Sequence, residues 1–80
     1  MNHILITGGS GFFGSILKKR LLELGHICVN IDLEHDTDNH PNLTSIQGDI
    51  RNIKTLKSLF TQHKFDAIFH CAAILAHEAK

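Results

Sequence analysis

Four glycines crowd residues 7–14, which read Thr-Gly-Gly-Ser-Gly-Phe-Phe-Gly. They fit two overlapping spacings, Gly9-x-Gly11-x-x-Gly14 and Gly8-x-x-Gly11-x-x-Gly14. Glycine lets a pyrophosphate approach the backbone closely and accepts the positive φ that a tight turn demands. A helix beginning near Phe12 would direct its free N–H groups and positive dipole end at that anion. The spacing predicts a phosphate-binding turn; the alternative is a strand-to-helix turn that has glycines for steric reasons only.

An aspartate follows this turn at about the 20-residue spacing typical of a group that binds the adenosine ribose. Asp32 closes an apolar stretch, and its carboxylate can accept from both ribose hydroxyls while repelling a 2′-phosphate. Residues 33–50 contain no lysine or arginine but several acidic residues, so a 2′-phosphate would find no cation there. The pattern predicts NAD rather than NADP as the cofactor; the alternative for Asp32 is a solvated turn residue.

Short apolar runs and helical periodicities surround these residues. In the helix after the glycine turn, Phe13, Ile16, Leu17, Leu21 and Leu24 are predicted to face the core, with Lys18, Lys19 and Glu23 in solvent. Strands are predicted at 3–7, 26–31, 43–47 and 65–71, helices at about 12–24 and 52–63, and a polar surface loop at 34–42.

Because parallel crossovers are right-handed, these elements predict an α/β fold with sheet order 3-2-1-4. This is part of a Rossmann-type, doubly wound parallel sheet, with the weaker third strand near an edge.

Two further segments follow the carboxyl ends of predicted strands. Asp49 could reach the adenine amino group while Ile50 packs on the ring, or Asp49 could be the N-cap of the next helix. Ala72 and Ala73 leave room for a ligand over the sheet edge, or serve ordinary packing.

Composition excludes several classes of protein. The 8 basic and 8 acidic residues balance, which gives no reason to expect nucleic acid or an anionic membrane surface as a partner. No apolar run approaches the ~18 residues needed to cross a bilayer, and the chain opens on a strand, so we expect a cytoplasmic protein. Cys28 and Cys71 are expected to be buried, unbridged hydrophobes. The seven histidines show no zinc-ligand spacing, so no metal site is predicted.

Taken together, the chain resembles the extended short-chain dehydrogenase/reductases, which include NAD-dependent nucleotide-sugar epimerases and dehydratases. Residues 7–14 are similar to the family's TGxxGFxG turn, and residues 25–29 lead to Asp32 as its second strand does. Residues 48–51 resemble its adenine-contacting segment, and residues 66–73 its DxVxHxAA strand. These motifs cover nearly the whole chain.

The resemblance implies a role for each matched position. Gly8, Ser10, Gly11, Phe12, Phe13 and Gly14 would form the pyrophosphate turn, chiefly through backbone. Asp32 and Leu33 would hold the adenosine ribose, and Asp49 and Ile50 would meet adenine. Cys71, Ala72 and Ala73 would line the nicotinamide ribose, while His70 is a strand residue and not a catalytic base.

The resemblance also implies groups that this sequence does not contain. Family members use a tyrosine, a lysine four residues later and a serine or threonine for catalysis, and this chain has no tyrosine. We therefore expect residues 1–80 to be the N-terminal part of an NAD-binding domain, inactive alone, without the C-terminal half and the substrate domain. The alternative is a non-catalytic nucleotide-binding or assembly module. In either case we expect a homo-oligomer.

Overall fold

The computed structural model describes residues 2–71. Every predicted strand and helix is present, with ends that differ from the prediction by at most two residues. The elements are β1 (His3–Thr7), α1 (Phe12–Glu23), β2 (Ile27–Asp32), β3 (Leu43–Gln47), α2 (Ile53–Gln62) and β4 (Ala67–His70).

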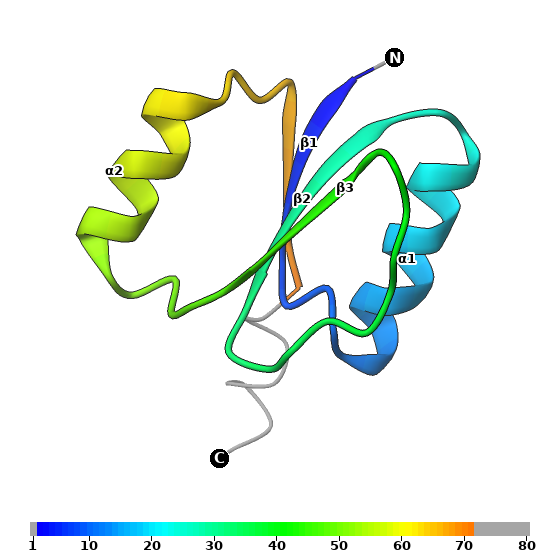
Figure 1. Cartoon of the computed structure of the whole chain (residues 1–80), viewed down its shortest axis with the longest axis horizontal. Coiled ribbons are helices and arrows are strands. Elements are labelled where there is room, and N and C mark those ends of the chain that lie inside the picture. The colour runs from blue at the N-terminus through cyan, green and yellow to red at the C-terminus, as the bar shows by residue number, and fades with distance from the viewer. Residues whose placement is uncertain (1, 72–80) are drawn as a thin grey trace.

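The four strands form one parallel sheet in the order β3-β2-β1-β4, which confirms the predicted topology. Helices α1 and α2 lie on opposite faces of this sheet, and the loop between β2 and β3 runs beside α1 (Figure 1). Because all strands are parallel, their carboxyl ends meet at one edge. This edge carries the glycine turn after β1 and Asp32 at the end of β2.

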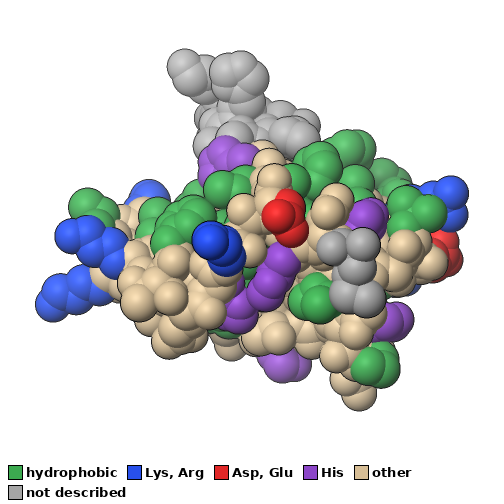
Figure 2. All heavy atoms as spheres, turned by 90° about the horizontal axis from the view of Figure 1, so that it is seen from above, with side chains coloured by type: hydrophobic (Ala, Val, Ile, Leu, Met, Phe, Trp, Pro, Cys, Tyr) green, Lys and Arg blue, Asp and Glu red, His purple; other side chains and the backbone are tan. Residues whose placement is uncertain are grey.

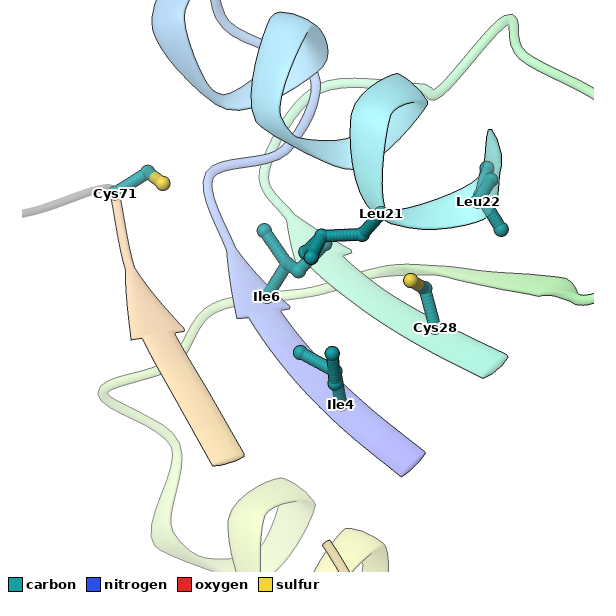
Figure 3. Packing of buried hydrophobic residues seen from close by; sticks show 6 residues of the cluster. All are labelled: Ile4, Ile6, Leu21, Leu22, Cys28 and Cys71. Atoms are coloured by element: carbon teal, nitrogen blue, oxygen red, sulfur yellow. The ribbon is translucent and has the colours of Figure 1, made fainter. Parts of the chain in front are cut away.

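The core has two layers because β1 and β2 are buried on both faces. On the α1 side the buried residues are Ile4, Ile6, Leu21, Leu22, Cys28 and Cys71 (Figure 3). On the α2 side they are Leu5, Val29, Ile31 and Leu59. Burial of each large aliphatic side chain contributes about 1.5–3 kcal/mol. Truncation of Ile6, which has no exposed surface, to alanine should therefore cost about 2–5 kcal/mol.

The predicted core face of α1 is only partly right: Leu21 is buried and Leu17 packs against the core, but Phe13, Ile16 and Leu24 are exposed. Phe13 and Ile16 are 57% and 55% exposed, and the buried residues are Gly14, Lys18, Leu21 and Leu22. These four follow the i, i+4, i+7, i+8 spacing of one helix face. The helix takes this rotation because Gly14 packs directly on the backbone of the glycine turn. Lys18 is thereby carried to the inside instead of into solvent.

Both cysteines are free and buried, as predicted. Burial raises the pKa of the Cys28 thiol, an effect that the nearby Lys18 charge partly offsets, and burial also raises the pKa of Cys71. Both therefore pack as neutral thiols and not as nucleophiles.

Several histidine side chains are visible when the molecule is viewed from the end of the sheet where the strands begin (Figure 2). His3 opens β1, His26 precedes β2 and His63 follows α2, so all three lie opposite the edge that carries the glycine turn. Within residues 2–71 no group of three or more His, Cys, Asp or Glu is arranged to hold a metal ion. In the same range, neither helix has the length and apolar character needed to span a membrane.

Candidate functional site

The first four amides of the glycine turn, those of residues 8–11, donate hydrogen bonds to acceptors within the chain. Gly8 adopts a φ of 75° and donates to the Ile31 carbonyl at 3.0 Å, and Gly11 donates back to Gly8. The Gly9 amide donates to Asn30 Oδ1 at 2.8 Å, and the Ser10 amide donates to Asp32 Oδ2 at 2.9 Å. These bonds attach the turn to the end of β2 and fix its shape.

The glycines of the turn are required for different reasons. A β-carbon at Gly14 would overlap the Gly8 carbonyl oxygen, and one at Gly9 would overlap the buried Asn30 side chain. A β-carbon at Gly11 would meet only the Gly8 oxygen, at an ordinary contact distance of 3.5 Å, and its φ of −78° suits any residue. Among residues 2–71, nothing obliges position 11 to be glycine. The space beside Gly11 is open to a group from outside the described chain.

The start of α1 offers unused donors beside that space. Gly11 is the N-cap and supplies no side-chain cap. Within the part of the chain that the structure describes, the amides of Phe12, Phe13 and Gly14 have no acceptor. Such amides, together with the positive end of the helix dipole, form an anion-binding position.

Asp32 lies at the same edge, half-buried at the end of β2. Its two carboxylate oxygens accept from the Ser10 amide at 2.9 Å and the Glu34 amide at 3.0 Å. Each oxygen retains a lone pair for a further donor. The carboxylate is therefore held in place and can still accept from hydroxyl groups. The next residue, Leu33, is 62% exposed.

The structure contradicts one of the two predicted roles of Asp49, which lies after β3. Asn52 is the N-cap of α2 and accepts from the Lys54 and Thr55 amides, so the N-cap alternative for Asp49 is wrong. Asp49 instead pairs with Arg51 at 2.7 Å, and hydrogen bonds from Arg51 lower the pKa of the Asp49 carboxyl. Ile50 is partly buried against the α2-side core.

At the end of β4, the His70 ring lies across from β1. Its Nδ1 is 2.6 Å from the Thr7 hydroxyl, and the Cys71 amide donates to the Thr7 carbonyl at 2.9 Å. These contacts keep the ends of β1 and β4 together. The predicted positions Ala72 and Ala73 lie outside the described residues.

The sequence analysis missed a buried polar cluster behind the turn. The Lys18 side chain is fully buried and its Nζ lies 2.7 Å from Asp36 and 3.0 Å from Asp38, both in the β2–β3 loop. Burial alone would raise the pKa of Asp36, but hydrogen bonds from Lys18, the Asp38 amide, Asn30 and Ser45 outweigh it and lower that pKa. A signal was present in the sequence: Asn30 is a polar residue in the middle of an otherwise apolar strand, and such a residue needs a partner.

A comparison with protein-family models matches residues 4–80 to the NAD dependent epimerase/dehydratase family. This chain belongs to that family. The match spans the glycine turn, Asp32 and all of β2, β3 and β4. It confirms the resemblance to epimerases and dehydratases.

Individual relatives agree with this family but differ in the activity that their names state. A 3-beta-hydroxysteroid dehydrogenase of Mycolicibacterium neoaurum is 40% identical over 76 residues, covering 94% of this chain and 20% of the relative. A UDP-glucose 4-epimerase of Neisseria meningitidis is 35% identical over 86 residues, covering 95% of this chain and 25% of the relative. The crystal structure of the Bordetella bronchiseptica enzyme WbmH in complex with NAD+ matches with a TM-score of 0.81 and 33% identity, over 88% of this chain and 25% of that one. The chain thus spans a fifth to a quarter of the length of these relatives.

Proposed function

We propose that this chain is the dinucleotide-binding part of an NAD-dependent epimerase or dehydratase that acts on a nucleotide sugar. The family match and a similar structure with NAD+ bound support the cofactor. The similarity to a UDP-glucose 4-epimerase supports the substrate class. Bound NAD would supply a nicotinamide that accepts and returns hydride.

One observation carries the cofactor assignment: open donors at the start of α1 stand beside a fixed carboxylate. We assign the pyrophosphate to the free amides of Phe12 and Phe13, which are at the positive end of α1. The open space at Gly11 admits that group, because a side chain there would reach into it. The amides of Gly8 and Ser10 are bonded within the chain and shape the turn, whereas Gly14 packs its α-carbon on the turn and, within residues 2–71, leaves its amide free beside those of Phe12 and Phe13.

The remaining positions are assigned around this center. Asp32 accepts from the adenosine ribose hydroxyls, with Leu33 against the ribose. Asp49 and Ile50 lie along the adenine, and Cys71, Ala72 and Ala73 line the nicotinamide ribose. The groups that move the substrate proton, a tyrosine and a lysine in this family, belong in our proposal to the rest of the protein, as does its oligomeric assembly.

The proposal is tested on the full-length protein by calorimetric titration of NAD⁺ and NADP⁺. We expect NAD⁺ to bind at least about tenfold more tightly than NADP⁺, equivalent to about 1.4 kcal/mol. No detectable binding of NAD⁺ would reject the cofactor assignment.

The substrate class is tested with the NAD⁺-loaded protein and two compounds that match the two kinds of relative. After rapid mixing we expect UDP-glucose to produce a transient NADH absorbance, which decays as the hydride is returned, and a 3β-hydroxysteroid to produce none. The reverse result would reject the nucleotide sugar while leaving the cofactor assignment intact.

A further inference from the structure

Lys18 is a buried cation whose partners come from an irregular loop. Its Nζ contacts Asp36 and Asp38, whose side chains are 4% and 27% exposed. Residues 33–42 form neither helix nor strand, so these ion pairs attach the loop to α1. A buried ion pair is seldom more stabilising than apolar residues of the same volume. The ion pair instead fixes the position of the loop relative to α1, because both partners must keep a defined geometry.

Asn30 connects this ion pair to the glycine turn. Its Nδ2 donates to Asp36 Oδ2 at 2.9 Å, and its Oδ1 accepts from the Gly9 amide at 2.8 Å. Ser45 on β3 donates to the same Asp36 oxygen at 3.0 Å. Asn30 is 1% exposed, so water does not compete for these bonds. A continuous path of buried polar contacts therefore leads from Lys18 to the backbone of the turn.

The two segments joined by this path are the two that hold Asp32. Ser10, next to Gly9, donates to one carboxylate oxygen, and Glu34 in the loop donates to the other. A shift of either segment would move or release an Asp32 oxygen. The geometry of the carboxylate thus depends on loop and turn staying in register.

We propose that Lys18 is a positioning residue of the dinucleotide site, which through Asp36 and Asn30 fixes the loop and the glycine turn on either side of Asp32. The inference rests on the proposed function for its ligand, but its structural half needs no cofactor. Lys18 touches no part of the assigned pyrophosphate position and acts only through the other residues.

The first experiment measures amide hydrogen exchange in the full-length protein without cofactor. The Lys18→Met variant keeps the length of the side chain and removes its charge, and Lys19→Met changes the exposed neighbour on the same helix. We expect Lys18→Met to speed exchange at least about tenfold both in the loop (Glu34, Asp38) and in the turn (Gly9, Ser10), with Leu5 in β1 unchanged. Lys19→Met should change neither segment.

A third variant cuts only the connection. Asn30→Ala leaves the Lys18 ion pairs in place, so the turn amides should exchange faster while the loop does not. If only the loop exchanges faster in Lys18→Met, Lys18 holds the loop on α1 without fixing the turn, and the proposal is overturned. Equal acceleration everywhere, Leu5 included, would mean that Lys18 serves only global stability and would overturn it as well.

The second experiment measures NAD⁺ affinity at a temperature where each variant is folded by circular dichroism. Lys18→Met should weaken NAD⁺ about tenfold and Lys19→Met less than twofold. The double variant Lys18→Met/Asp36→Asn removes the unpaired buried charge, so it should recover part of the lost melting temperature but not the affinity. Affinity that recovers along with stability would overturn the positioning role. If the wild-type protein binds no NAD⁺, the proposed function fails, and the exchange data still decide whether Lys18 fixes the turn.

Discussion

Gly14 in α1 packs directly on the carbonyl group of Gly8, with the Gly9 Cα only 2.8 Å from where a Gly14 β-carbon would stand. Backbone meets backbone here, and neither side can yield as a flexible side chain would. This contact sets the rotation of α1, places Lys18 inside and directs the first free amides of the helix to the open side of the turn.

Two alanine substitutions in the same turn should therefore affect different properties, one the stability of the fold and the other the affinity for NAD⁺. Gly14→Ala should lower the free energy of unfolding by about 1–3 kcal/mol, because the new methyl group overlaps backbone. Gly11→Ala should change it by less than about 1 kcal/mol, since position 11 has room and an ordinary φ. Its effect should be on NAD⁺ affinity, at least about tenfold weaker. Urea unfolding and NAD⁺ titration of both variants measure this; undiminished affinity in Gly11→Ala would contradict the pyrophosphate position.

Removal of the Asp32 carboxylate should weaken NAD⁺ and relax the discrimination against NADP⁺. Each charge-assisted hydrogen bond to a ribose hydroxyl contributes about 1.5–3 kcal/mol, and the loss of a negative charge reduces repulsion of a 2′-phosphate. Titration of both cofactors into Asp32→Ala tests this, with Glu23→Ala, an exposed change at the far end of α1, as the control. If Asp32→Ala binds NAD⁺ as the wild type does, the ribose role is rejected.

The Lys18–Asp36 pair should give the protein an acid-sensitive component of stability. The pKa of Asp36 is lower in the folded chain than its usual value of about 3.9, so the unfolded chain binds the extra proton. This contribution is complete well above that usual value and is lost as the pH falls below it, toward the lower pKa of the folded chain. Urea midpoints between acid and neutral pH should fall less steeply toward acid in Asp36→Asn than in wild type. Glu23→Gln, the control, should keep the wild-type slope, and parallel curves for all three proteins would show that Asp36 contributes nothing.

The sequence predicted the elements of this fold because each is encoded locally. Apolar runs identified the strands, and the glycines and Asp32 identified the carboxyl edge where they meet. The face of α1 could not be read in the same way. Its apolar residues allow more than one rotation, and the choice is made by the packing of Gly14 on Gly8, a contact between different elements. The pairing of Lys18 with Asp36 could not be predicted from the sequence either. Asp36 lies in an irregular loop whose position depends on this ion pair, and the ion pair in turn depends on the rotation of α1.

The 80-residue polypeptide by itself is expected to self-associate at micromolar concentrations. Among residues 2–71, β4 pairs with β1 alone, so its other edge presents backbone groups to pair with another chain. Ile68 and Phe69 are 52% and 38% exposed. They lie beside Leu5 and Ile6 in register, so they extend the edge as apolar surface on both faces of the sheet.

Residues 34–42 form a polar loop and no second helix, which suggests that the sheet face under α1 is poorly covered. Because Lys18 holds this loop against α1, however, that face should contribute little to the association. A charge at the β4 edge should therefore reduce self-association. Phe69→Lys should shift the polypeptide toward monomer, whereas Lys19→Glu, on the exposed face of α1, should not. Sedimentation velocity over a range of concentrations distinguishes the species. A wild-type polypeptide that sediments as a single monomer and unfolds cooperatively would show that these strands and helices bury enough surface to be stable without further cover.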